Sequence, residues 1–279
     1  MKKISFERAW WAACAAGAAV ILTGSAFSFL APDAGRYNFN DFPVLAYQAE
    51  AARRFHVVSG RLWGYDPHFM AGYPLTFIWN SNVAIQWLAV RFPGASVMEV
   101  VRGFLFSGLL LFAPMWWLTL RNFGFDRREA ARSFVAGGLY FLLGMPALLF
   151  AAGMPTAGAA TYLSLFAASF IYRYARDGGP WWLGVAAAAS LSLFIHKTSA
   201  VMLFAPALFA VVWLAAQRRR GRIAGLVAAG AIAIAFNFFW IRVVVEYMPH
   251  LKKAAEAPFW MNLDPLRPLK DYFTGTVVM

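Results

Sequence analysis

Long apolar runs separated by short basic clusters constrain this chain more than any other feature of its sequence. The chain is 61% hydrophobic and 14% charged, whereas a soluble domain is about half apolar and about a quarter charged. Runs of about 20 apolar residues are long enough to cross about 30 Å of hydrocarbon. The sequence therefore predicts an all-α, polytopic membrane helix bundle with about seven transmembrane helices. The expected spans are residues 9–31, 99–120, 133–151, 159–172, 181–195, 200–216 and 223–245.

The first apolar run has two interpretations. It follows a basic start at residues 1–8 and contains small residues near its end, as a cleavable signal peptide would. The run is longer than the roughly 7–15 apolar residues of a signal-peptide core. We therefore expect an uncleaved first span with the N-terminus in the cytoplasm.

The basic residues predict the orientation of the spans. Thirteen of the twenty-five Lys and Arg residues lie in four short segments, 1–8, 121–132, 173–180 and 217–222. Because cytoplasmic loops carry an excess of Lys and Arg, these segments are expected in the cytoplasm. The loop 32–98, the turn at 196–199 and the segment 246–279 then lie outside. The same clustering between apolar runs argues that the net charge of +12 does not serve nucleic-acid binding.

Motifs of several site classes are absent from the sequence. The chain has one cysteine, Cys14, which excludes an internal disulfide and a cysteine metal cluster. Glycine-rich phosphate loops, HExxH, GxSxG and paired CxxC motifs are missing as well. The expected organisation is a seven-span module at 1–245, which includes the external loop, and an external C-terminal segment at 246–279.

The loop of roughly sixty residues is too long to be a simple connection, and we expect it to build any active site. Residues 41–58 have apolar side chains at helical spacing, opposite Gln48, Glu50 and Arg53. This pattern predicts a helix along the membrane surface. Residues 83–92 predict a second short interfacial helix, and 60–79 a turn-rich, aromatic segment.

Three polar residues of this loop are candidates for chemistry, each with a structural alternative. Asp41 opens the predicted first interfacial helix and is the strongest candidate, although Asp is also a favoured N-cap residue. Asp66 and His68 could supply a second carboxylate and a metal ligand. Asp-Pro is also an ordinary turn starter, which favours the structural interpretation there.

Several cations are expected near the outer membrane boundary. His196 and Lys197 interrupt two apolar helices at a turn that would normally use Gly, Asn or Pro. Arg102 and Arg242 lie near the outer ends of their spans. Together they form a candidate binding patch for an anionic group such as a lipid phosphate. Snorkelling of the side chains at helix ends remains the alternative for the turn.

The arrangement of these features is similar to a known family. A basic N-terminus, one span, a long external loop with an early Asp, and the run GRLWGYDPHFMAGYPL at 60–75 resemble the GT-C superfamily of membrane glycosyltransferases. The sequence looks most like the bacterial YfhO-like branch, whose first loop carries a comparable aromatic and Gly/Pro-rich run. The resemblance extends loosely over the seven-span order, including FNFFW at 236–240.

The resemblance implies a GT-C-like protein of the bacterial plasma membrane. Its expected partners are the bilayer and a polyprenyl-phosphate-linked sugar, which would be transferred to an acceptor on the extracytoplasmic face with inversion. Asp41 would be the general base, and His196, Lys197, Arg242 and Arg102 would meet the lipid phosphate. Two features depart from the family pattern. An adjacent acidic pair is missing around Asp41, and the chain stops soon after the seventh span, where relatives continue, which implies a fragment or a minimal module.

The cofactor requirement and the function class stay open on the sequence. If a divalent metal ion takes part, Asp41, Asp66 and His68 are the available ligands. The alternative functions are a non-catalytic GT-C-like protein and a polytopic transporter. A transporter usually carries ionisable residues near the bilayer midplane, whereas the polar residues of this chain gather at the expected outer edge.

Overall fold

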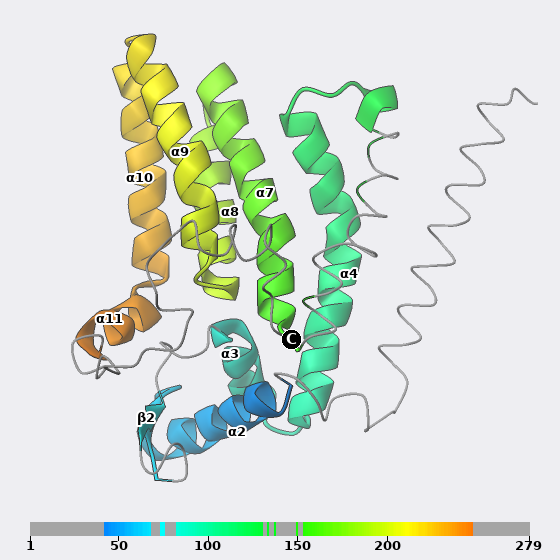
Figure 1. Ribbon diagram of the computed structural model, residues 1–279, viewed down its shortest axis with the longest axis vertical. Helices are drawn as coiled ribbons and strands as arrows, with labels where there is room; N and C mark the ends of the chain where they lie inside the picture. The colour runs from blue at the N-terminus through cyan, green and yellow to red at the C-terminus, as the bar shows by residue number, and fades with distance from the viewer. Residues whose placement is uncertain are drawn as a thin grey trace, which may run out of the picture. The chain divides into compact units, whose positions relative to one another are not determined.

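The computed structural model describes residues 42–67, 73–75, 82–130, 133, 137, 149 and 153–247. The chain divides into two compact units, Met1–Val244 and Val245–Met279, and nearly all described residues belong to the first. The elements are mostly helices (Figure 1). They are α2 (Phe42–Ser59), β1 (Gly64–Asp66), β2 (Tyr73–Leu75), α3 (Val83–Arg91), α4 (Val97–Asn122), α7 (Pro155–Asp177), α8 (Trp181–Ile195), α9 (Ser199–Ala216), α10 (Arg220–Phe236) and α11 (Phe238–Tyr247).

The described part of the bundle is built around α7. This helix contacts α4, α8, α9 and α10, and α10 also packs against α8 and α9 (Figure 1). The core between these helices is rich in alanine, including Ala167, Ala186, Ala229 and Ala233. Small residues allow helix backbones to approach closely. At Gly184, a β-carbon would collide with the ring of Phe170 across the α7–α8 interface.

The described residues are consistent with an all-α membrane protein, but they do not show seven spans. Among the described residues, α4 and α9 are long and apolar enough to cross a membrane, and the pair α10 and α11 would be a third span if counted as one. The apolar helix α8 has 15 residues and is short for a span. Helix α7 has 23 residues, but Thr, Ser and Tyr side chains lower its hydropathy. The expected spans 9–31 and, for the most part, 133–151 lie outside the described residues.

The seventh expected span, 223–245, is not one straight helix. Helices α10 and α11 are separated by Asn237 and are bent by 74° relative to each other. Asn237 is fully buried, and its Nδ2 donates to the carbonyl oxygens of Ala233 (2.9 Å) and Ser190 (3.0 Å). Its Oδ1 accepts a hydrogen bond from Nε1 of Trp240 (2.8 Å). These bonds give the buried amide of Asn237 and the indole N–H of Trp240 hydrogen-bond partners inside the apolar bundle.

Both helices expected in the large loop are present. Helix α2 matches the predicted 41–58 and α3 matches 83–92, and the two pack against each other. Gln48, expected on the polar face, is instead buried at 2% exposure. Strands β1 and β2 pair as an antiparallel hairpin with Asp66 opposite Tyr73, so the segment does not consist of turns alone. The hairpin lies close to α2, because a β-carbon at Gly64 would meet the Phe55 ring at 2.8 Å.

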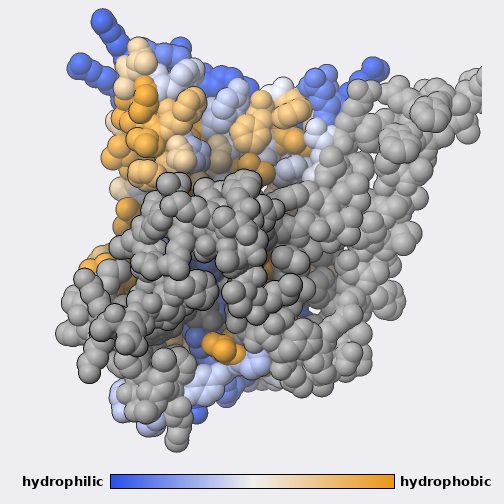
Figure 2. All heavy atoms as spheres, in the orientation of Figure 1, coloured by the Kyte–Doolittle hydropathy of each residue, from blue (hydrophilic) through white to orange (hydrophobic). Residues whose placement is uncertain are grey.

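The outer surface of α9 is strongly apolar. Val201, Phe204 and Phe209 are 77%, 67% and 72% exposed, which is costly in water and expected for side chains facing lipid. Figure 2 shows hydrophobic side chains over α9 and α10, with hydrophilic atoms gathered where these two helices meet. That junction contains the basic residues of 218–222.

Candidate functional site

An apolar groove of about 900 Å³ opens between the loop helices and the bundle. Leu183 and Phe194 of α8, Phe236 of α10 and Phe239 of α11 form one wall. The end of α2 and one side of α3 form the other. The bend at Asn237 turns α11 away from the axis of α10, so that Phe236 and Phe239 both line the groove.

Polar and aromatic side chains border the groove on the loop side. Trp87 and Arg91 of α3 line it together with His56 from the last turn of α2. The guanidinium of Arg91 lies 5.2 Å from the centroid of the Trp87 ring. Trp87 also meets Phe194 edge to face, with centroids 6.1 Å apart, and so connects α3 to α8. The groove therefore combines a long apolar wall with a cationic and aromatic border.

Asp66 is held in a pairing that stabilises the hairpin against α2. Its side chain is 3% exposed, accepts a hydrogen bond from the Tyr47 hydroxyl (2.7 Å) and lies 3.4 Å from Nη2 of Arg54. The hydrogen bond to Asp66 raises the pKa of Tyr47. Both partners bind Oδ2 of a buried carboxylate, so Asp66 has a structural role in joining β1 to α2. Within the described ranges, no group of three His, Cys, Asp or Glu side chains could hold a metal ion.

Asp41 and His68, the other two loop candidates, lie outside the described residues. Asp41 directly precedes Phe42, the first residue of α2. The role assigned to Asp41 therefore stays a prediction. The same holds for the three-residue metal site that would combine it with Asp66 and His68.

The predicted turn between two apolar helices is confirmed at 196–198, and its histidine is fixed inside it. The backbone N–H of Thr198 donates to Nδ1 of His196 (3.2 Å), and the Thr198 hydroxyl lies 2.7 Å from the same atom. Burial and the charge of Lys197 lower the pKa of His196 to about 4. His196 is therefore neutral at pH 7, and it would meet a phosphate as a neutral Nε2–H donor rather than as a cation. Burial also lowers the pKa of Lys197.

The four basic candidates lie on three different elements. His196 and Lys197 share the α8–α9 turn, Arg102 lies in the second turn of α4, and Arg242 is exposed on α11. Arg102 is half-buried, with a buried Nε atom. The hydrogen bond from Tyr47 and the ion pair with Arg54 join Asp66 to α2.

The residues at the border of the groove were not predicted from the sequence, although the spacing of two of them indicates a shared helix face. Trp87 and Arg91 are four residues apart on the predicted interfacial helix, so they share one face. Trp is enriched at the membrane interface, and Arg stacks readily on aromatic rings. His56, in contrast, joins them only through the packing of α2 on α3, which no local pattern specifies.

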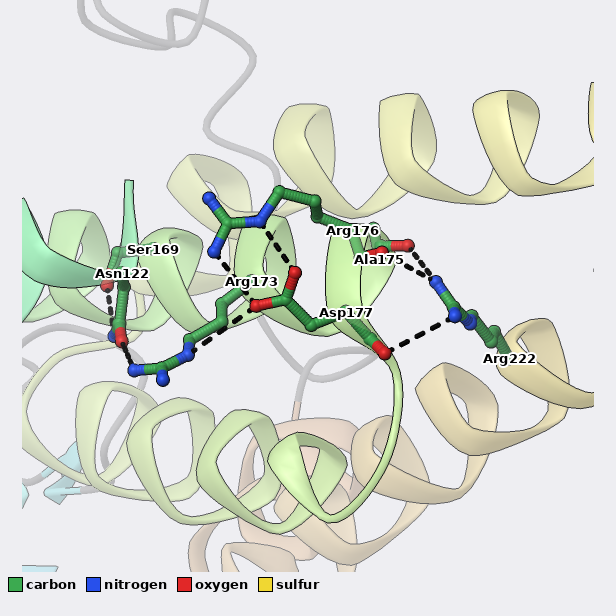
Figure 3. Close-up of polar contacts among 7 residues, drawn as sticks. All are labelled: Asn122, Ser169, Arg173, Ala175, Arg176, Asp177 and Arg222. Atoms are coloured by element: carbon green, nitrogen blue, oxygen red, sulfur yellow. Dashed lines mark hydrogen bonds and ion pairs between the residues drawn. The ribbon is translucent and has the colours of Figure 1, made fainter. Parts of the chain in front are cut away.

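A network of arginines connects the other ends of the bundle helices (Figure 3). Nη1 of Arg173 donates to Oδ1 of Asn122 (2.8 Å), and Nδ2 of Asn122 donates to the Ser169 hydroxyl (3.0 Å). Arg173 also lies over the Trp181 ring, 3.4 Å from its centroid, and its Nε is 3.9 Å from Asp177. These contacts join α4, α7 and α8 at the end of the bundle that carries the basic clusters.

The C-terminus of α7 is capped by an arginine from α10. Arg222 donates to the carbonyl oxygens of Ala175 (2.7 Å), Arg176 (2.9 Å) and Asp177 (3.3 Å). The last carbonyls of a helix have no partner within it, and Arg222 satisfies three of them. Arg176 forms a two-pronged pair with Asp177 (2.7 and 2.8 Å), and this pair lowers the pKa of the Asp177 carboxyl. These contacts give Arg173, Arg176 and Arg222 a structural role in joining the helices.

Comparison with known proteins finds no matching family model, no matching curated protein and no matching solved structure.

Proposed function

We propose that the protein is a GT-C-like membrane glycosyltransferase with seven spans in the plasma membrane. It would move a sugar from a polyprenyl-phosphate donor to an acceptor on the extracytoplasmic face, with inversion. The basis is the resemblance of the first loop together with one structural observation. That observation is the apolar groove between the loop helices and the bundle, with Arg91 and Trp87 at its border.

The groove suits a lipid-linked donor for physical reasons. Its apolar wall would bury the prenyl chain, which gains about 0.8 kcal/mol for each CH₂ group removed from water. Arg91 and His56 at the border lie where a phosphate at the end of such a chain would need donors. Since α3 and the end of α2 form one wall, the external loop in this proposal both binds the donor and carries the catalytic residue.

The proposed reaction is a single displacement at the anomeric carbon. The Asp41 carboxylate takes the proton from the acceptor hydroxyl, and the acceptor oxygen forms a bond to that carbon as the bond to the phosphate oxygen breaks. The leaving polyprenyl phosphate keeps the electron pair. Lys197, Arg242, Arg102 and Arg91, with the Nε2–H of His196, would stabilise the charge that develops on it. No step is assigned to a metal ion.

The first test compares wild-type protein with Asp41→Asn in proteoliposomes. Transfer of labelled sugar from a panel of polyprenyl-phosphate donors is measured for both. We expect wild-type transfer, reduced at least about a hundredfold in the variant, because general-base catalysis contributes about 10²–10⁴-fold. Equal transfer by both proteins would remove Asp41 from the mechanism. Absence of transfer in both would favour the alternatives, an inert GT-C-like protein or a transporter.

The second test concerns the groove and has a matched control. Arg91 and Arg61 both lie 5.2 Å over a tryptophan ring in the external loop, but only Arg91 lines the groove. Arg91→Gln is expected to raise the KM for the lipid donor about fivefold to tenfold, because one basic residue near a membrane surface contributes about 1 kcal/mol to binding an anionic group. Arg61→Gln should leave it unchanged. Equal effects of the two substitutions would argue against donor binding in this groove.

A further inference from the structure

A second apolar groove, of about 380 Å³, lies between α7 and α9 near the arginine network. Its hollow exists because small side chains line it, namely Ala168 and Ala175 of α7 and Ala210 of α9. Phe209 and Trp213 stand at its sides. From Ala168 to Arg176 the groove extends about 12 Å along α7, at 1.5 Å for each residue.

The groove opens toward the lipid-facing side of α9. Phe209, one of its lining residues, is 72% exposed, and Phe204 and Val212 of the same helix are 67% and 59% exposed. In a membrane protein such a hollow is filled by acyl chains. The polar end of the groove then selects the head group of the bound lipid.

The polar end consists of Tyr172 and Arg176. The Arg176 guanidinium lies 5.5 Å from the centroid of the Tyr172 ring, and its Nε and Nη2 atoms pair with Asp177. Its Nη1 atom points elsewhere and lies against Gly124, 2.9 Å from where a β-carbon would stand. One edge of the guanidinium is therefore directed at the turn that follows α4.

A second guanidinium borders the same turn. Nη1 of Arg121 donates to the carbonyl oxygen of Phe125 (2.6 Å), directly next to Gly124. In the described residues of the segments 121–130, 173–179 and 217–222, nine arginines stand against three acidic side chains. The end of the groove is therefore strongly cationic even with the Arg176–Asp177 pair formed.

We propose that this groove binds an anionic phospholipid, with an acyl chain between α7 and α9 and the phosphate at Arg176 and the 122–126 turn. The apolar groove along α7 ends at positively charged side chains, and this arrangement is complementary to a lipid with a negative head group. Binding of this lipid would fasten α4, α7 and α9 together. The proposal does not depend on the proposed glycosyl transfer, which is assigned to the groove lined by α3 and α8.

The test measures lipid binding to the full-length protein in detergent micelles. Phosphatidylglycerol and phosphatidylcholine with identical acyl chains are titrated, and bound lipid is counted by native mass spectrometry. We expect tighter binding of phosphatidylglycerol, and Arg176→Gln should weaken it about fivefold, as one basic residue near a charged surface contributes. Arg61→Gln, which removes an exposed arginine from the segment between α2 and β1, far in sequence from this groove, is the matched control and should have no effect.

Two further variants separate head-group binding from a structural role of Arg176. Asp177→Asn releases the guanidinium from its pair, so binding of phosphatidylglycerol should be kept or increased. If Arg176→Gln and Asp177→Asn weaken binding equally, the residue acts through its ion pair and the proposal is wrong. Ala168→Leu fills the groove without touching the pair and should also weaken binding. Unchanged binding by this variant, or equal affinity of the wild type for the two lipids, would overturn the proposal.

Discussion

Arg53 shows how a single side chain sets the geometry of the segment that carries α2 and α3. Its Nε donates to the carbonyl oxygen of Ala89 (2.9 Å), and its Nη2 donates to those of Phe92 (3.1 Å) and Ala95 (2.6 Å). These carbonyls belong to the end of α3 and the link to α4, where a helix leaves its backbone acceptors unpaired. Arg53 thus holds α2 against the end of α3, the helix that lines the groove.

Replacement of this arginine should loosen the loop. Arg53→Lys keeps the charge, but a single ammonium lacks the guanidinium fork that serves three carbonyls, so we expect unfolding to become easier by about 1–3 kcal/mol. Thermal unfolding in detergent measures the change. The neighbouring Arg54→Lys is the control, because Arg54 is half-exposed and an ammonium can still pair with Asp66. Equal losses in both variants would refute the special role of Arg53.

His196 should make the protein sensitive to mild acid. Its pKa falls from 6.5 to about 4 on folding, so between these pH values the unfolded chain binds the extra proton and the folded chain does not. The free energy of unfolding therefore decreases as the pH falls through this window, by at most about 3 kcal/mol. Unfolding curves at pH 7 and pH 4.5 should differ less for His196→Gln than for wild type. The exposed His56→Gln should behave like wild type, and a flat wild-type profile would contradict the assignment.

The bend between α10 and α11 is the element that shapes the apolar groove lined by α3 and α8. One buried amide, Asn237, serves the carbonyls of Ala233 and Ser190 and the indole of Trp240. The carbonyl of Ser190 belongs to α8, so the bend is anchored to the neighbouring helix. A straight helix over the same residues would place Phe239 on a different face of the bundle.

Loss of this amide should destabilise the bend. Asn237→Leu keeps a similar volume but leaves the buried indole N–H of Trp240 without its acceptor and removes the side-chain bond to the Ser190 carbonyl, which we expect to cost about 3 kcal/mol. Thermal unfolding with and without a polyprenyl phosphate measures both stability and groove occupancy. Phe238→Leu, at an exposed neighbouring position, should change stability by less than about 0.5 kcal/mol. A stable Asn237→Leu variant that still binds the lipid would show that the bend does not depend on the amide.

Some elements are specified by the local sequence, and others by contacts between segments that are distant in the sequence. Helices α2 and α3 and the turn at 196–198 could be predicted, because local periodicity and polar interruptions mark them. The bend at Asn237 was missed, because the apolar run at 223–245 continues through it and one of the bonds of Asn237 goes to Ser190 on another helix. The hairpin was missed for a related reason, since β1 packs against α2, where Gly64 lies close to Phe55. In the candidate site, the pairing of Trp87 with Arg91 could be predicted from their spacing of four residues. The neutral state of His196 could not, because it depends on burial in the folded protein.

At the scale of the whole molecule, charge separates the two ends of the helices. The end with the α9–α10 junction carries Arg218, Arg219, Arg220 and Arg222, and the C-terminus of α7 adds Arg173 and Arg176. The opposite ends of the same helices meet the 196–198 turn and the loop helices. This asymmetry is what the positive-inside rule uses, and the proposed function requires the loop to lie outside the cytoplasm.

The orientation can be tested with two cysteines. In a Cys14→Ala background, which removes the one native cysteine, Val57→Cys and Arg219→Cys place a thiol at exposed positions of α2 and of the α9–α10 junction. Intact cells are treated with a thiol reagent that does not cross membranes. We expect labelling of the cysteine at position 57 at once and of the one at 219 only after permeabilisation, because the arginine-rich end should face the cytoplasm. The reverse order would place the donor groove in the cytoplasmic leaflet and exclude transfer on the extracytoplasmic face, and labelling of both in intact cells would refute the separation of these two segments by a membrane.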